Sequence, residues 1–345
     1  MYESFYGLKT KPFQTVPDPG FLYLSKGHDL ALTMLRYGLM TAAPLTVITG
    51  AVGAGKTTLL RHIMNEMPEE LTVGLISNMQ AGRGELLEWV MMALSQPFAG
   101  KSYVELFQAF QDFVIERYAE GRRVVLIFDE AQNLDIPTLE ELRLLSNINA
   151  DGEQLLQLIL VGQPQLRDLL NDPRLTQFVQ RIVSDFHLMP LEPEEVEPYI
   201  DRRLKVAGAH WKIFPAESCA LIHEATGGVP RLINSLCDLC LVSGFSAEEK
   251  VIRPELLREF LASAEKHEIY RQFRRLRSAA EVEAPRRPAV DEEPPLYLDP
   301  GMAAREASDL AAPPGPAGPA GPGRKGSVRD GSGAEVISWP RRGKD

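Results

Sequence analysis

The sequence has few cysteines, no long apolar run and no excess of positive charge. Three cysteines in 345 residues give no disulfide framework, which favours a reducing compartment. No apolar run approaches the roughly 20 residues needed to cross a bilayer. The opening residues MYESFYGLKTKPF lack a basic segment followed by an apolar core, so no secretory leader is expected. These absences predict a cytoplasmic protein that meets a membrane only through partners.

Positive charge is scarcest in the part of the chain with periodic patterns. The formal net charge is −10 and the pI is near 5.3. From residue 271 onward, thirteen Lys and Arg outnumber eleven Asp and Glu, so residues 1–270 carry −12. Nucleic-acid affinity depends on a positive surface that displaces counterions. A nucleic acid is therefore not expected as a partner.

Composition changes abruptly near the C-terminal end. Residues 268–345 hold eleven of the 26 prolines and few aromatic or β-branched residues. Such a segment cannot bury enough apolar surface to offset its ordering entropy, so a disordered tail is predicted there. A docking peptide in its VISWPRRGKD run is the alternative to a plain linker.

Short apolar runs alternate with helical patterns in the first half of the chain. The runs lie at 45–49, 72–76, 123–129, 156–162 and 183–189. Continuous apolar strands separated by helices predict a parallel sheet covered on both faces. The predicted fold class is therefore α/β, with a nucleotide-binding domain over residues 1–189.

The strands stop after residue 189, and only helical patterns follow. They lie at 194–207, 215–226, 229–245 and 253–264. These patterns predict a small all-helical domain over residues 190–267, joined to the first by a short connector.

The stretch GAVGAGKTT follows the first predicted strand and precedes a predicted helix. It matches G-x-x-x-x-G-K-[ST] at Gly50, Gly55, Lys56 and Thr57. Glycines let backbone N–H groups converge on phosphate, Lys56 neutralises its charge, and the Thr57 hydroxyl is placed for Mg²⁺. We therefore predict a P-loop with nucleotide contacts from Gly50, Ala51, Val52, Gly53, Ala54, Gly55, Lys56, Thr57 and Thr58.

The stretch VVLIFDEAQ places two carboxylates at the end of a buried strand. Ligands of parallel sheets bind at the carboxyl ends of the strands. Asp129 is predicted to hold Mg²⁺ through water, and Glu130 to polarise the water that attacks the γ-phosphate. Acidic residues there could also be plain helix N-caps, but the upstream P-loop favours catalysis. Hydrolysis, and not binding alone, is expected.

Four further side chains are candidate sensors of the nucleotide. Gln163 ends a strand beside the carboxylates and is predicted to sense the γ-phosphate, the alternative being a strand-end turn. Arg181, and less favourably Arg174, precede the last strand, from where an arginine finger could reach a nucleotide in a neighbouring subunit. A surface salt bridge is the alternative for both. Arg231 lies in the first turn of a helix, where a cation opposes the helix dipole unless an anion is near, which favours a second sensor.

Two of the cysteines form a CxxC pair, Cys237 and Cys240, in the middle of a predicted helix among leucines. No second Cys/His pair lies nearby in the sequence. Buried packing is predicted, with zinc or redox chemistry as the alternative.

Taken together, residues 1–267 resemble the AAA+ ATPases of the general secretion pathway protein A type. The resemblance is carried by MYESFYGLKTKPFQTVPDPGFLYLSKGHDLALTMLRYGL, GAVGAGKTT, LIFDEAQNL, LILVGQPQL, QRI and GGVPRLIN. It implies ATP and Mg²⁺ as cofactors, a homo-oligomer with nucleotide at subunit junctions, and an N-terminal segment near the adenine and ribose. Core packing is the alternative for Phe13, Phe21 and Tyr23 in that segment.

The chain departs from secretion-pathway members of the family in one respect. Those members continue into a membrane span and a peptidoglycan-binding domain, whereas this chain ends in a polar, Pro/Gly-rich tail. The shorter branch found beside exosortase and exopolysaccharide loci fits better. Gln163 stands where an asparagine sensor is usual.

The resemblance implies an ATPase that drives assembly or gating of an envelope export or exopolysaccharide system, with an inner-membrane partner. Two rival hypotheses are a DNA-associated regulator of the transposition type and a nucleotide-gated scaffold with little turnover. The acidic composition of residues 1–270 disfavours the first.

Overall fold

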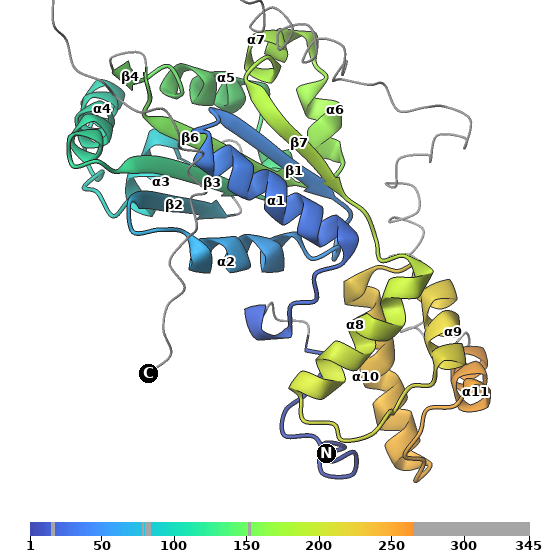
Figure 1. Cartoon of the computed structure of the whole chain (residues 1–345). Coiled ribbons are helices and arrows are strands. Elements are labelled where there is room, and N and C mark those ends of the chain that lie inside the picture. Colours follow the sequence, from blue (N-terminus) through green and yellow to red (C-terminus); the bar gives the residue numbers. More distant parts are fainter. Residues whose placement is uncertain (15–17, 78, 80–83, 151–152, 265–345) are drawn as a thin grey trace, which may run out of the picture. The chain divides into compact units, whose positions relative to one another are not determined.

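The computed structural model describes residues 1–14, 18–77, 79, 84–150 and 153–264. The disordered tail predicted over 268–345 lies outside the described residues. At the centre of the N-terminal half is a five-stranded parallel sheet in the order β2-β3-β6-β1-β7 (Figure 1). Its strands are β1 (Leu45–Gly50), β2 (Leu71–Ser77), β3 (Arg123–Asp129), β6 (Leu156–Gly162) and β7 (Ile182–Leu188). The predicted α/β fold class is confirmed.

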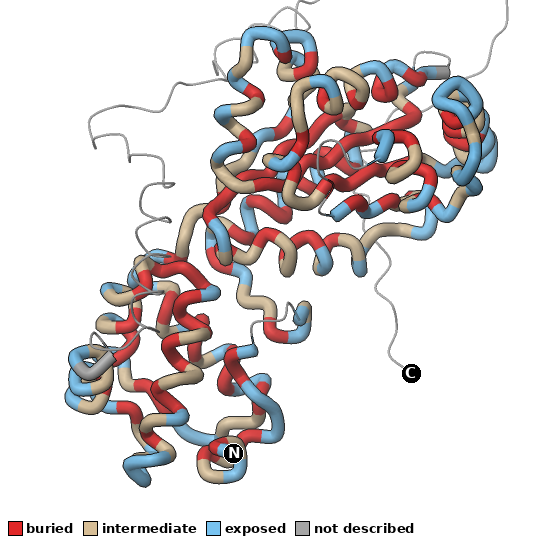
Figure 2. Tube along the Cα trace, turned by 180° about the vertical axis from the view of Figure 1, so that it is seen from behind, coloured by how far each residue is buried: buried red, intermediate tan, exposed pale blue. Residues whose placement is uncertain are grey.

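Helices cover both faces of this sheet. Val125 and Ile127 of β3 share one apolar cluster with α1 and α2, while Leu126 and Phe128 share another with α3, α4 and α5. Burial on both faces explains why β3 reads as a continuous apolar run, and its interior is fully buried in Figure 2. The helices are α1 (Lys26–Met40), α2 (Lys56–Glu66), α3 (Leu86–Ala93), α4 (Tyr103–Ala119), α5 (Ile136–Leu145), α6 (Gln165–Leu170) and α7 (Thr176–Val179).

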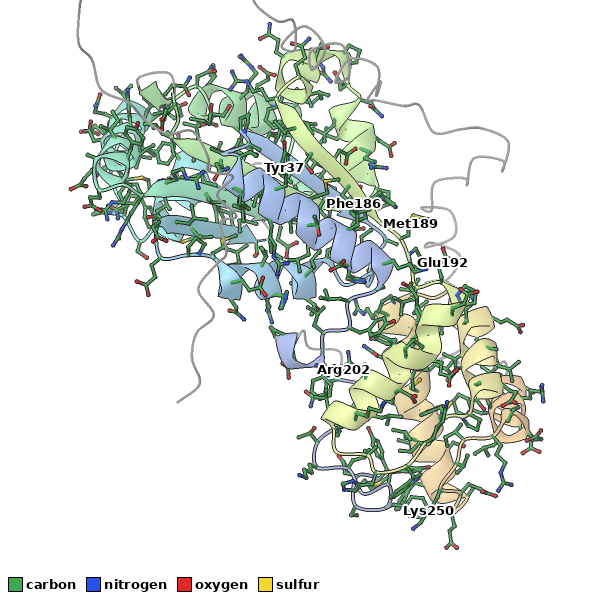
Figure 3. The ribbon with its side chains drawn as sticks, in the orientation of Figure 1. Tyr37, Phe186, Met189, Glu192, Arg202 and Lys250 are labelled. Atoms are coloured by element: carbon green, nitrogen blue, oxygen red, sulfur yellow. The ribbon has the colours of Figure 1, made fainter. Side chains whose placement is uncertain are left out.

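Shorter elements complete this half. They are the hairpin of β4 (Asn149–Ala150) and β5 (Glu153–Gln154), and the 3₁₀ turns η1 (Pro19–Phe21), η2 (Ala131–Asn133) and η3 (Pro173–Leu175). The connector from β7 to the next helix runs between Met189 and Glu192, both labelled in Figure 3.

Four helices form the rest of the described chain. Each begins and ends within one residue of its predicted range: α8 (Pro193–Val206), α9 (Ala216–Thr226), α10 (Pro230–Ser246) and α11 (Pro254–Ala264). Their apolar faces meet in one cluster that includes Ile200, Ile222 and Leu236. Cys237 and Cys240 are free thiols buried in the same cluster, as the packing hypothesis requires.

The N-terminal residues belong to this helical cluster. Tyr2, Tyr6, Leu8 and Phe13 are buried in it, and the Tyr6 hydroxyl donates to the Glu249 carbonyl at 2.9 Å. This arrangement differs from the expectation that residues 1–189 form one domain with the sheet. The chain starts in the helical core, crosses to the sheet, and returns at α8.

Candidate functional site

Three strands end together at one edge of the sheet and bring the predicted site residues to that edge. Thr49 of β1 pairs with Gly162 of β6, and Asp129 of β3 pairs with Val161 of the same strand. The parallel register therefore places the P-loop, the carboxylates and Gln163 side by side.

The P-loop needs its glycines for two different reasons. Gly53 and Gly55 have φ values of +81° and +103°, which side chains rarely adopt. A Cβ at Gly53 would also lie 2.5 Å from the Cβ of Arg231, and one at Gly55 would lie 2.7 Å from Nε2 of His28. The loop is thus packed between the first turn of α10 and the first turn of α1.

Lys56 extends back along the loop that it follows. Its side chain is buried, and its Nζ donates to the carbonyls of Gly50 at 2.6 Å and Ala51 at 3.0 Å. These bonds hold the ammonium group inside the curve of the loop. A phosphate there would meet this positive charge.

Thr57 of α2 and Asp129 of β3 are joined by a hydrogen bond. The Thr57 hydroxyl donates to Oδ2 of Asp129 at 3.2 Å, and the backbone N–H of Glu130 donates to Oδ1 at 3.0 Å. Burial, and then the nearby Glu130 carboxylate, raise the pKa of Asp129 above its ordinary value. A hydroxyl beside a half-buried carboxylate with a like-charged neighbour fits Mg²⁺, which prefers oxygen ligands.

Glu130 is held by two side-chain amides. It has a left-handed φ of +59°, and its Oε2 accepts from Nε2 of Gln132 at 2.7 Å and from Nε2 of Gln163 at 3.0 Å. Burial alone raises the pKa of Glu130, but the bonds from Gln163 and Gln132, with the charge of Lys56, bring the pKa below its usual value. The carboxylate is therefore ionised at neutral pH, as a general base must be.

Gln132 closes a small network that sequence reasoning did not identify. Its Oε1 accepts from the backbone N–H of Gln163 at 2.9 Å while its amide donates to Glu130. It thereby ties the end of β6 to the carboxylate. Its position in DEAQ was the only signal available from the sequence.

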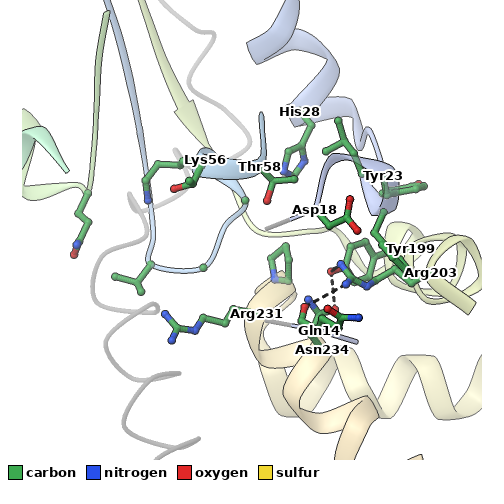
Figure 4. A pocket seen from close by; sticks show the side chains of 18 of the residues that line it. Gln14, Asp18, Tyr23, His28, Lys56, Thr58, Tyr199, Arg203, Arg231 and Asn234 are labelled. Carbon is green, nitrogen blue, oxygen red and sulfur yellow. Dashed lines mark hydrogen bonds between the residues drawn. The ribbon is translucent and has the colours of Figure 1, made fainter. Parts of the chain in front are cut away.

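Arg231 brings α10 to the P-loop. Its backbone N–H donates to the Gly53 carbonyl at 3.2 Å, and its aliphatic stem packs on Gly53. The side chain is exposed and lies beside the loop (Figure 4).

These groups line a cavity of about 360 Å³ (Figure 4), within the size range of small-ligand sites. Nine of the predicted residues line the cavity: Val52, Gly53, Gly55, Lys56, Thr57, Thr58, Glu130, Gln163 and, from α10, Arg231. Gly50, Ala51, Ala54 and Asp129 are not among the lining residues. The remaining lining residues are Gln14, Asp18, Phe21, Leu22, Tyr23, His28, Tyr199, Arg203, Pro230 and Asn234.

The far end of the cavity is built around a buried arginine. Arg203 donates through Nε to the Pro12 carbonyl at 2.7 Å and lies over the Phe21 ring at 5.1 Å. Its Nη1 donates to the Tyr199 hydroxyl at 3.3 Å, which in turn donates to Asn234 at 2.7 Å. Phe21 is thus a core residue and a lining residue at once.

Arg181 lies at the opposite edge of its own sheet. It precedes Ile182, which pairs with Leu45 at the start of β1, whereas the P-loop follows Gly50, roughly 20 Å along the strand. Its guanidinium donates to Ser146 and Asn147. It does not line the cavity of its own chain, so its predicted role in a neighbouring site stays a prediction.

Arg174 makes the surface pair that was the alternative for both arginines. It donates to Asp172 at 2.9 Å and 2.8 Å, and its side chain is 70% exposed.

No helix within the described residues is long and apolar enough to cross a membrane.

Comparisons with known proteins find relatives of this chain. Residues 40–170 match the family described as AAA domain. General secretion pathway protein A of Aeromonas hydrophila is 37% identical over 258 residues, covering 74% of this chain and 47% of that protein. The chain thus spans less than half the length of this relative.

Solved structures share the fold at low identity. The ORC2 protein of Aeropyrum pernix has a TM-score of 0.55 at 16% identity, covering 88% of this chain and 90% of that one. Cdc6p from Pyrobaculum aerophilum has a TM-score of 0.54 at 19% identity, covering 72% and 71%. Identities this low show a common fold alone.

Proposed function

We propose that this chain, an AAA-domain protein related to general secretion pathway protein A, binds ATP with Mg²⁺ in the cavity and hydrolyses it. The observation that carries the proposal is the meeting of the P-loop, the Thr57–Asp129 pair and an ionised Glu130 at one sheet edge. Backbone N–H groups of the loop and the Lys56 ammonium would hold the phosphates.

Each remaining site residue has a role in this proposal. Thr57 and Asp129 would hold Mg²⁺, which neutralises phosphate charge when bound. Glu130 accepts the proton of the attacking water, and Gln132 and Gln163 fix the direction of its carboxylate. Arg231 would contact the γ-phosphate and report its presence to α10.

We further propose that the protein works as an oligomer with ATP at a subunit junction. Support comes from Arg181, which lies far from its own P-loop and at the sheet edge opposite to it. A neighbouring chain would then supply it to the cavity as an arginine finger.

The cellular role proposed here follows the relative. ATP turnover on the cytoplasmic side would drive assembly or gating of an envelope export or exopolysaccharide system, through a partner in the inner membrane. Support for this role comes from the 37% identity to general secretion pathway protein A.

Phosphate release by the purified chain tests the hydrolysis proposal. The wild type is expected to release phosphate from ATP with Mg²⁺, and Lys56→Ala to abolish that release. Lys101→Ala, on the surface before α4, serves as the matched control and is expected to keep wild-type activity. Phosphate release that survives Lys56→Ala would contradict the proposal.

The same samples distinguish the rival hypotheses. Assembly that changes with ATP while no phosphate appears would favour a nucleotide-gated scaffold. Salt-dependent binding to DNA in a gel-shift assay would favour the DNA-associated regulator.

A further inference from the structure

His28 contacts the P-loop from the first turn of α1 and also lines the cavity. Its side chain is 4% exposed, and its Nε2 lies 3.1 Å from the Ala54 carbonyl oxygen. Its Nδ1 lies 2.7 Å from the hydroxyl of Ser25, the N-cap residue of that helix. The imidazole therefore bridges a helix start and the phosphate-binding loop.

The hydrogen-bond network fixes the tautomer of this ring. A carbonyl oxygen only accepts, so Nε2 must carry the proton that bonds to Ala54. The Ser25 hydroxyl accepts from the backbone N–H of His28 at 3.2 Å and donates its own hydrogen to Nδ1. Burial lowers the pKa of His28, although the bond to Ala54 and the charge of Glu195 oppose this, which agrees with a neutral ring.

The bond to Ala54 determines where the next N–H points. In a planar trans peptide the C=O and the following N–H point in opposite directions. Because the Ala54 carbonyl turns to His28, the Gly55 N–H turns away from the ring, and Gly55 forms part of the cavity wall. The ring also sits so close that a Cβ at Gly55 would meet Nε2 at 2.7 Å.

We infer that His28 is a positioning residue for the P-loop: its Nε2–H holds the Ala54 carbonyl and so directs the Gly55 N–H at a bound phosphate. This inference rests on the proposed binding of ATP. The bond of His28 to Ala54 prepares a backbone donor for the nucleotide.

Calorimetric titration of Mg²⁺ and ATP into the full chain tests the inference. His28→Leu keeps the side-chain volume and removes the donor, so ATP affinity is expected to fall about tenfold. His28→Gln places an amide N–H near the position of Nε2 and is expected to restore affinity to within about threefold of the wild type. His28→Asn, whose shorter amide reaches Ser25 but not Ala54, is expected to bind as weakly as His28→Leu.

A control variant and a second readout separate positioning from folding. His62→Leu removes an imidazole on α2 that pairs with Glu66 at 3.2 Å, and is expected to bind ATP as the wild type does. Melting temperatures without nucleotide report any loss of stability. His28→Gln and His28→Asn should differ in ATP affinity even where their melting temperatures agree.

The outcomes are distinct for the two proposals. Wild-type chain that fails to bind ATP would overturn the proposed function and this inference with it. Tight binding by the wild type and by His28→Leu alike would overturn the inference alone. Equal weakening in His28→Gln and His28→Leu would also overturn it, because the donor would then make no difference.

Discussion

Glu130 is the residue on which the proposed chemistry depends, and its surroundings pull its pKa in opposite directions. Burial raises the pKa, while two amide donors and Lys56 lower it. The balance keeps the carboxylate ionised in a half-buried position. The pKa of Glu130 therefore depends on the amide donors of Gln132 and Gln163 as well as on the burial of Glu130 itself.

Replacing Gln132 by Leu should therefore shift the pH dependence of hydrolysis. Burial remains when the amide donor is lost, so the pKa of Glu130 rises. A base with a raised pKa loses activity at a higher pH, so the acidic limb of the kcat profile should move to higher pH. Gln96→Leu, in the loop after α3 and outside the cavity, is the control. An unchanged acidic limb in Gln132→Leu would contradict this reading.

At the scale of single residues, local motifs can be predicted from the sequence, whereas contacts between distant positions cannot. The P-loop and the two carboxylates are recognisable because spacing within a few residues determines their geometry. The bond from the Gln163 N–H to Gln132 joins positions 31 residues apart, and only the pairing of β3 with β6 brings them together. His28 was inside a quoted motif, but its bond to Ala54 depends on how α1 packs.

Among elements, the N-terminal segment has the placement least evident from the sequence. The predicted domain over residues 1–189 includes this segment together with the sheet. Its aromatic residues instead complete the helical core, where Phe13 meets the Phe214 ring at a centroid distance of 6.1 Å. Aromatic residues in a sequence predict burial but do not indicate which core they belong to.

Arg203 should anchor this segment to α8. Arg203→Met removes its bonds to the carbonyls of Pro12 and Gln14, and we expect the free energy of unfolding to fall by about 3 kcal/mol. Its exposed neighbour Arg202, labelled in Figure 3, gives the matched control Arg202→Met, for which little change is expected. Chemical denaturation measures both. Equal effects of the two variants would argue against the anchor.

The contact of α10 with the P-loop leads to a prediction of the same kind. Arg231→Ala keeps the backbone bond to Gly53 but removes the cation beside the loop, so kcat should fall at least tenfold with a smaller change in stability. Arg253→Ala, exposed before α11, is the control. Wild-type turnover in Arg231→Ala would exclude a sensing role.

For the whole molecule, the proposal is that the site forms between two chains. Arg181 and the P-loop lie at opposite edges of the sheet, so one subunit would complete the site of the next. The sequence predicted this division from the order of the motifs, but partner and oligomer number depend on surfaces that no short motif encodes.

Mixing two inactive variants tests the shared site. Arg181→Ala lacks the finger and Glu130→Gln lacks the base, so each alone should hydrolyse ATP at least tenfold more slowly than the wild type. Mixed oligomers contain junctions where Glu130 of one chain meets Arg181 of the other, and activity should reappear on mixing. Arg174→Ala, which loses a surface pair, should stay active throughout. A mixture no more active than its components would contradict a shared site.

The central claim is that one cavity both binds ATP and hydrolyses it, and Glu130→Gln separates these two steps in a single sample. Titration of this variant with ATP and Mg²⁺, followed by phosphate measurement in the same cell, is the most direct test. The account predicts affinity within about threefold of the wild type and turnover reduced about a hundredfold or more. Undiminished turnover, or binding lost together with turnover, would contradict it.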